Sequence, residues 1–161
     1  MEIRYATKED VKNIAKVEAL CFPPSEAAKE NDFIERVKYY GNHFWLMFDN
    51  DKLVSFVDGF VTDEKDLTDE MYENASMHNE KGAWQMIFGV NTIEEYRKKG
   101  IAEKLIKEAI RDAKTQGRKG LVLTCKDKLV HYYSKFGFID EGISSKSTHG
   151  NVKWHQMRLL L

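Results

Sequence analysis

Residues 84–113, WQMIFGVNTIEEYRKKGIAEKLIKEAIRDA, decide the fold of this chain. The stretch opens with an apolar run, Trp84 to Val90, which predicts a buried strand. A polar loop, Asn91 to Tyr96, leads to the basic tetrapeptide Arg97-Lys98-Lys99-Gly100. The remainder has apolar residues at helical spacing and predicts an amphipathic helix. The expected order is therefore strand, loop and helix, and the helix has a cationic, glycine-containing start.

The start of this helix predicts an anion site. The first N–H groups of a helix have no partner inside it, and the macrodipole adds positive potential at that end. Gly100 lets backbone approach a ligand closely, and Ala102 leaves the first turn uncrowded. Basic side chains oppose the dipole at this end unless an anion binds. A phosphate-binding role is therefore favoured over an ordinary solvated helix start.

Composition limits the classes of protein that this chain can represent. The chain has 161 residues, 42% of them hydrophobic, which predicts one domain, 1–161, with its own core. The formal net charge of -1 argues against a nucleic-acid partner and against an anionic membrane surface. No apolar run has the length of a membrane span, so we expect a cytoplasmic protein. Cys21 and Cys125 are expected to be reduced thiols, and Cys125 to lie in the core.

The chain before residue 84 predicts a strand, two helices and a hairpin. Thr7 can cap the first helix, and Pro23-Pro24 ends it. Ser25 can cap the second helix, which Gly41 ends. The expected strands cover residues 2–6, 43–48 and 53–61. Residues 63–80 form a long acidic insertion, which is typical of a functional or mobile segment.

The chain after residue 113 predicts three more strands and one helix. The strands cover residues 121–125, 138–143 and 151–161, and the helix covers residues 128–135. Hairpins at the front and strand–helix–strand crossovers in the middle predict a mixed α+β class. No repeat or low-complexity linker marks a second domain.

Two blocks of this sequence resemble the GNAT superfamily of N-acetyltransferases. The pattern Arg97-x-x-Gly100-x-Ala102, between a strand and a helix, is similar to the acetyl-CoA signature of the superfamily. Residues 126–138, KDKLVHYYSKFGF, resemble its later helix and the Tyr-x-x-x-Gly-Phe ending. Short runs near Phe22 and Cys125 are most similar to the arylalkylamine N-acetyltransferase branch. The resemblance implies a GNAT fold, with a central mixed sheet of about six to seven strands flanked by about four helices.

The resemblance also implies roles for individual residues. The end of the strand would lie beside the pantetheine arm of acetyl-CoA, with a backbone N–H near Phe88 polarising the thioester carbonyl. Backbone amides at the helix start would hold the pyrophosphate. The expected cofactor-binding residues are Phe88, Gly89, Val90, Arg97, Lys98, Lys99, Gly100, Ile101, Ala102 and Tyr133.

Tyr133 is the expected general acid that protonates the departing thiolate of coenzyme A. A phenol has an unperturbed pKa of about 10, so it keeps its proton at neutral pH and can donate it to a thiolate. From the residues alone, Tyr133 is more typical of a helix aromatic packed beside Tyr132 and Phe136. The resemblance favours the acid role.

The base that deprotonates the acceptor amine stays open at this point. The vertebrate arylalkylamine enzymes carry two histidines on the strand before the signature, whereas this chain has Trp84 and Met86. Neither side chain can take a proton. A water chain, Glu26 or His78 could serve instead, and Glu26 is our candidate catalytic residue. Glu26 could also be a first-turn acid, and His78 a solvated loop residue.

The expected activity is transfer of acetyl from acetyl-CoA directly to a primary amine of a small molecule, arylalkylamine or polyamine-like, in a ternary complex. A protein or peptide acetyltransferase and a catalytically silent acyl-CoA-binding module are the alternatives. The histidines lack ligand spacing, so we expect no metal. We expect a monomer or homodimer. The acidic insertion could steer a cationic acceptor or only keep the surface soluble.

Overall fold

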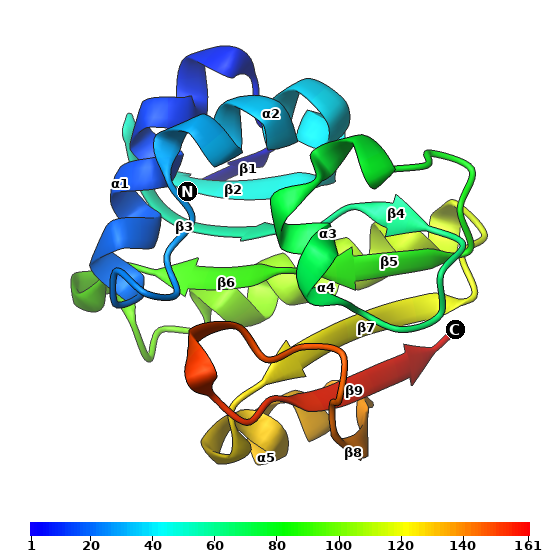
Figure 1. The fold of residues 1–161 in the computed structure, drawn as a ribbon. Helices are drawn as coiled ribbons and strands as arrows, with labels where there is room; N and C mark the ends of the chain where they lie inside the picture. Colours follow the sequence, from blue (N-terminus) through cyan, green and yellow to red (C-terminus); the bar gives the residue numbers. More distant parts are fainter. The chain divides into compact units, whose positions relative to one another are not determined.

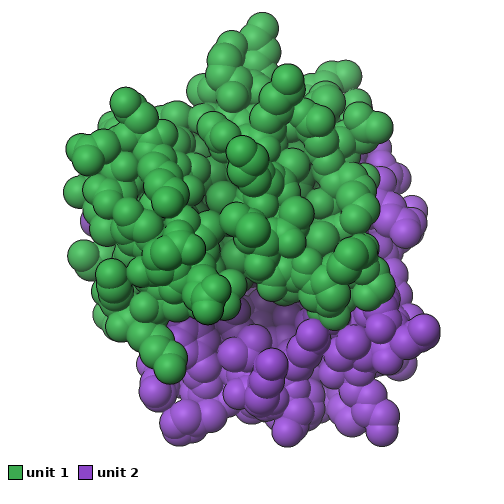
Figure 2. Space-filling view, turned by 90° about the vertical axis from the view of Figure 1, so that its left-hand side faces the viewer, with its two compact units in different colours: residues 1–59, 89–109 green, residues 60–88, 110–161 purple.

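The chain divides into two units, and each unit combines two separate stretches of sequence. The computed structural model describes residues 1–161. Unit 1 holds residues 1–59 and 89–109, and unit 2 holds residues 60–88 and 110–161. Figure 2 colours unit 1 green and unit 2 purple. Strands and helices both occur in each unit, so the expected mixed α+β class is confirmed.

Unit 1 contains an antiparallel sheet in the order β1-β2-β3-β6 (Figure 1). Its strands are β1 (Glu2–Arg4), β2 (Phe44–Asp49), β3 (Lys52–Asp58) and β6 (Gly89–Thr92). The turn between β2 and β3 places Asn50 at a φ of 53°, and the side chain of Asn tolerates this left-handed conformation. The predicted hairpin is therefore confirmed, and its return strand ends at Asp58.

Two helices of unit 1, α1 (Val11–Cys21) and α2 (Glu30–Tyr40), lie together over this sheet (Figure 1). Phe33 of α2 is fully buried, with its ring edge-on to the rings of two strand residues, Phe44 and Phe56. Ser25 does not cap α2, so that prediction is wrong. The carboxylate of Asp32 accepts the N–H of Lys29 at 2.8 Å, which moves the helix start to Glu30.

Unit 2 contains a five-stranded sheet in the order β4-β5-β7-β9-β8. Strands β5 and β7 pair in parallel, and the other pairs are antiparallel. The crossover that was predicted between a strand and a later parallel strand is thereby confirmed. The short helix α5 (Val130–Ser134) packs against β8 and β9. The strands are β4 (Val61–Thr62), β5 (Trp84–Ile87), β7 (Gly120–Cys125), β8 (Ile139–Ile143) and β9 (His155–Leu160).

Two apolar runs that each predict one strand contain two strands each. Residues 53–61 divide after Asp58, and residues 84–90 divide at Phe88. In both runs one strand joins the four-stranded sheet of unit 1 and the other joins the five-stranded sheet of unit 2. A continuous apolar pattern marks burial but carries no sign of a change of sheet. Gly59 follows the end of β3 at the first break, and Gly89 begins β6 directly after the second break.

The predicted amphipathic helix is α4 (Ile101–Thr115), the longest helix of the chain. Ile101, Leu105, Ala109 and Ala113 are buried along one side, as the pattern predicts. The acidic insertion contains a short helix, α3 (Asp69–Glu73). None of these helices combines the length and the apolarity that a membrane span needs. Short 3₁₀ turns occupy Lys8–Asp10, Gly41–His43, Ala75–Met77, Glu94–Tyr96, Asp127–Leu129 and His149–Asn151.

Candidate functional site

The loop before α4 exposes backbone N–H groups at the predicted anion site. Lys98 and Gly100 both have left-handed backbone, with φ of 61° and 75°. The first helical bond runs from the N–H of Lys104 to the carbonyl of Gly100 at 3.2 Å. Because Ile101 and Ala102 precede this bond, their N–H groups have no carbonyl one turn earlier in the helix. A Cβ on Gly100 would meet nothing within 4 Å, so the backbone is open to a ligand.

Arg97 shapes this loop through contacts inside unit 1. Its Nε donates to the carbonyl of Thr92 at 2.8 Å, and its Nη2 lies 3.9 Å from the Sγ of Cys21. The side chains of Lys98 and Lys99 are exposed at the same loop. Lys98, Lys99 and the backbone amides are therefore the groups best placed for an anion, and Arg97 ties their loop to β6.

A second cluster in unit 1 consists of buried polar side chains and was not predicted. Asp58, Arg36 and Glu18 are 1%, 5% and 6% exposed. Nη1 of Arg36 donates to Oδ2 of Asp58 at 3.4 Å, and Oε2 of Glu18 accepts the N–H of Ala28 at 2.9 Å. Oδ1 of Asp58 has no hydrogen-bond partner. An acid inside the apolar run 53–61 was the one signal in the sequence that could have found this cluster.

Burial of Asp58 couples the stability of the protein to pH. Burial is the main cause that raises the pKa of this carboxyl from 3.8 to about 7, and Glu18 also raises it. Arg36 acts in the opposite direction. Between these pKa values the folded chain holds a proton that the unfolded chain has lost. The stabilisation is therefore fully present below about pH 4 and is lost as pH rises through the folded pKa.

We expect the wild type to lose at least about 10-fold in folding equilibrium constant, relative to Asp58→Asn, between pH 5 and pH 8. Urea unfolding at pH 5, 6, 7 and 8 measures this difference. Asp66→Asn is the control. Hydrogen bonds from Gln156 and Lys146 outweigh burial and lower the Asp66 pKa, so this variant should differ from wild type by a constant amount over the same range. A constant difference for Asp58→Asn would contradict the expectation.

Tyr133 lies in unit 2 on α5, and it is 6% exposed. Its ring centroid is 5.1 Å from that of Tyr132 and 6.2 Å from that of Phe138, both at steep angles. Burial raises the pKa of its phenol well above the ordinary value, and Tyr132 and Cys125 add to the rise. The hydroxyl therefore stays protonated at neutral pH, as a general acid must before it acts.

Five aromatic side chains of unit 2 form a continuous row that begins at Phe60 and Phe88. The ring of Phe88 lies 5.0 Å from Phe60 and 4.9 Å from Tyr72. Tyr72 lies 4.6 Å from His149, and His149 stacks on Trp154 at 4.8 Å with planes 21° apart. We call Phe60, Phe88, Tyr72, His149 and Trp154 the aromatic row. It combines the strand ends, the acidic insertion and the loop before β9, so no local pattern in the sequence predicts it.

Several acids of the insertion have structural partners inside unit 2. Asp66 binds Arg158 at 3.0 Å, and Asp69 accepts the backbone N–H of Thr148 at 2.9 Å. Glu80 binds Arg118 at 3.1 Å. These contacts tie the insertion to the sheet of unit 2. These three carboxylates are consequently already paired, which weakens their attraction for a cationic acceptor.

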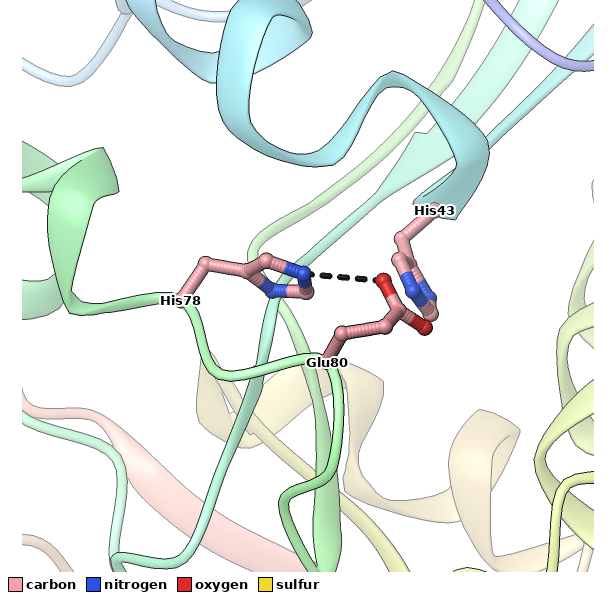
Figure 3. Close-up of side chains that lie close together, drawn as sticks. All are labelled: His43, His78 and Glu80. Atoms are coloured by element: carbon pink, nitrogen blue, oxygen red, sulfur yellow. Dashed lines mark hydrogen bonds and ion pairs between the residues drawn. The ribbon is translucent and has the colours of Figure 1, made fainter.

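His78 and Glu26, the two candidate bases from the sequence, occupy different surroundings. Nδ1 of His78 accepts the N–H of Val61 at 3.1 Å, and Nε2 lies 3.0 Å from Oε1 of Glu80 (Figure 3). Since Nδ1 accepts, the neutral ring carries its proton on Nε2 and donates it to Glu80. Glu26 lies in a turn between α1 and α2, where its N–H donates to the carbonyl of Pro23 at 2.9 Å. It is not in the first turn of a helix, so that interpretation is wrong.

The two cysteines are free thiols, as expected. Cys125 is 2% exposed, and burial raises the pKa of its thiol to about 12. A thiol with so high a pKa is a poor nucleophile at neutral pH, which agrees with a core role.

The sequence matches the profile of the family described as Acetyltransferase (GNAT) family over residues 10–138. The chain belongs to the GNAT family. The match includes the loop at Arg97, the start of α4 and Tyr133. As a GNAT-family N-acetyltransferase the protein is an enzyme, and its family uses acyl-CoA as the group donor. The narrower resemblance to the arylalkylamine branch receives no support from these comparisons.

Solved GNAT structures share this fold over almost the whole chain. The loading GNATL domain of CurA from Lyngbya majuscula is 15% identical, with a TM-score of 0.83 over 99% of this chain and 96% of that chain. The GphF GNAT-like decarboxylase in complex with isobutyryl-CoA is 16% identical, with a TM-score of 0.84 over 99% of each chain. A chain of the NatC complex bound to Gag peptide and CoA is 16% identical, with a TM-score of 0.75 over 100% of this chain and 99% of that chain. A search of curated proteins gives no match.

Proposed function

We propose that this GNAT enzyme transfers the acetyl group of acetyl-CoA directly to the primary amine of a small molecule with an aromatic body. The loop at Lys98 to Ala102 is the observation that carries the cofactor half of the proposal. Its left-handed residues, the open space at Gly100 and the N–H groups of the helix start suit a pyrophosphate. The GphF structure holds isobutyryl-CoA, which supports an acyl-CoA donor for this fold.

The mechanism follows from the roles of individual residues. Backbone groups of Phe88, Gly89 and Val90 would bond to the pantetheine arm, with an N–H near Phe88 stabilising the oxyanion. The amine nitrogen attacks the thioester carbon, the new C–N bond forms, and the C–S bond then breaks. Tyr133 would give its proton to the departing thiolate and regain one from solvent. No acyl-enzyme is needed, which agrees with the buried, poorly nucleophilic Cys125.

The aromatic row supports an aromatic acceptor over a polyamine. Flat rings favour offset or edge-on contact with another ring, and Tyr72, Phe88 and His149 of the row are partly exposed. A polyamine would instead need several unpaired carboxylates, and three acids of the insertion, Asp66, Asp69 and Glu80, already have partners, which leaves the exposed Glu64, Glu70 and Glu73. We therefore place an arylalkylamine before a polyamine-like acceptor.

Peptide acetylation is the second candidate. The NatC structure is bound to Gag peptide and CoA, and its fold matches this chain along its whole length. The test is release of free coenzyme A thiol from acetyl-CoA in the presence of arylalkylamines, diamines, amino acids and peptides with a free amino terminus. We expect the fastest release with arylalkylamines. Release only with peptides would overturn the small-molecule proposal, and binding of acetyl-CoA without any release would indicate a silent binding module.

Removing one ring of the aromatic row should affect the acceptor alone. For Tyr72→Ala we expect the KM of the best aromatic amine to rise by at least about 10-fold, from the lost ring contact and apolar area. The KM of acetyl-CoA should stay within about 2-fold of wild type. Tyr72→Phe is the matched control, because it keeps the ring and removes the hydroxyl, which lies 3.1 Å from Oγ1 of Thr124. Equal KM values for both variants would remove Tyr72 from acceptor binding.

A further inference from the structure

The buried cluster in unit 1 contains more acid than base. Asp58 and Glu18 are both carboxyls, and Arg36 is the guanidinium among them. With both carboxyls ionised, this buried group would carry an excess negative charge, which a low-dielectric interior disfavours strongly. Tyr40, also on α2, is fully buried and stays neutral because burial raises its pKa well above the ordinary value. Ionisation of both carboxyls is therefore disfavoured, and Asp58 and Glu18 titrate as a coupled pair.

The unpaired oxygen of this cluster lies over the first residue of β6. Asp58 and Gly89 are opposite each other in the antiparallel register of β3 and β6. A Cβ on Gly89 would lie 3.0 Å from Oδ1 of Asp58 and 3.7 Å from Oε1 of Glu18. Because Gly89 has no side chain, both carboxyls approach the backbone there. Gly89 directly follows Phe88, whose N–H is the proposed oxyanion donor.

We propose that Asp58, coupled to Glu18, accepts the proton that the acceptor ammonium must lose before it attacks the thioester. This inference rests on the proposed function and names the missing base of its reaction. The ammonium R–NH₃⁺ gives one proton to the carboxylate pair and becomes R–NH₂. The nitrogen then forms the C–N bond and loses a second proton. The thiolate takes up one proton when the C–S bond breaks, so these two protons balance. The acid pair returns its proton to solvent after product release.

The charged and titratable groups around Asp58 fit this role. From α1 it faces Glu18, and from α2 it faces Arg36 and Tyr40, with Asp32 acting on the cluster from a greater distance. From β6 it faces the amide of Asn91, which also lies 3.0 Å from the Cβ position of Gly89. Arg36 donates to Oδ2, whereas Oδ1 is buried and has no hydrogen-bond partner of its own. The pKa of about 7 allows Asp58 to gain and lose a proton near neutral pH.

The test compares pH profiles of kcat/KM for the best amine at saturating acetyl-CoA. For Asp58→Asn we expect a fall of at least about 10-fold at pH 7, shrinking to under about 3-fold at pH 9.5, where more of the amine is already neutral. Asp58→Glu should restore part of the activity at pH 7. The affinity for acetyl-CoA should not change. Ser55→Ala is the matched control, because Ser55 is another buried polar residue of β3, hydrogen-bonded to the carbonyl of Asn91 at 2.6 Å. It should leave the pH profile unchanged.

A loss by the same factor at every pH would assign Asp58 a structural role and overturn the proposal. Should Asp58→Asn fail to fold, Glu18→Gln provides the same comparison. Carbon NMR of the wild type with labelled aspartate carboxyls follows the titration without any substitution. If no Asp carboxyl titrates between pH 6 and pH 8, the proposal that Asp58 is the base is also overturned. Wild type without turnover of any amine would overturn the proposed function and this inference together. If the wild type turns over an amine and Asp58→Asn has the same pH profile of kcat/KM as the wild type, the role of Asp58 is overturned and the proposed function stands.

Discussion

Gly100→Glu is expected to weaken acetyl-CoA binding by at least about 100-fold, which corresponds to about 2.7 kcal/mol. The substitution places a carboxylate at the start of α4, where the exposed N–H groups are proposed to hold the pyrophosphate. Like charges repel, and the new carboxylate can itself occupy the anion site. Isothermal titration calorimetry with acetyl-CoA, at one fixed ionic strength, measures the change.

The chain offers a close control for the backbone cost of this substitution. Gly100 has a φ of 75° and Gly117 a φ of 77°, and at both positions a Cβ would meet nothing within 4 Å. Each Glu substitution therefore has a similar left-handed strain, about 1–2 kcal/mol. At Gly117, after the carboxyl end of α4, Glu also opposes the macrodipole. Gly117→Glu should be the less stable variant and still bind acetyl-CoA normally. Equal affinities for both variants would refute the anion site.

Tyr133→Phe is expected to lower kcat by at least about 10-fold while acetyl-CoA binding stays within about 2-fold of wild type. The ring keeps its place against Tyr132 and Phe138, and only the proton donor is lost.

Two further measurements separate this role from packing. Tyr132→Phe changes the neighbouring phenol and should keep at least about half of the wild-type kcat. An acetyl donor with a leaving group of low pKa, such as an acetylated thiophenol linked to pantetheine, should reduce the defect of Tyr133→Phe because it needs less acid assistance. A kcat unchanged by Tyr133→Phe would remove Tyr133 from the mechanism.

The local features of this protein follow from its sequence. The spacing of Ile101, Leu105 and Ala109 predicts α4, and the Asp-Asn-Asp turn at residues 49–51 predicts the hairpin. The glycine at residue 100 and its basic neighbours predict a cationic, glycine-containing helix start, which the structure contains. In each case neighbours along the chain decide the conformation, so a single sequence carries enough information.

Features that depend on distant residues could not be predicted in this way. The pairing of Asp58 with Gly89 brings together positions that are far apart in the sequence, and only the register of β3 and β6 reveals it. The aromatic row likewise collects rings from separate loops. The start of α2 was misplaced because Ser25 resembles an N-cap, whereas the N-cap is Lys29, whose N–H donates to the carboxylate of Asp32 in the first turn.

The division of each unit between two stretches of sequence has a consequence for synthesis on the ribosome. Once residue 59 has left the ribosome, β3 can pair with β2. The other edge of β3 has no partner until β6 is made, and Gly89 lies thirty residues after Gly59. Strand β5 likewise waits for β7, whose first residue, Gly120, pairs with Trp84. A nascent chain therefore exposes apolar strand edges for much of translation, the state most open to misassociation. We expect chaperone engagement to peak in this window and to fall once β6 and β7 have emerged.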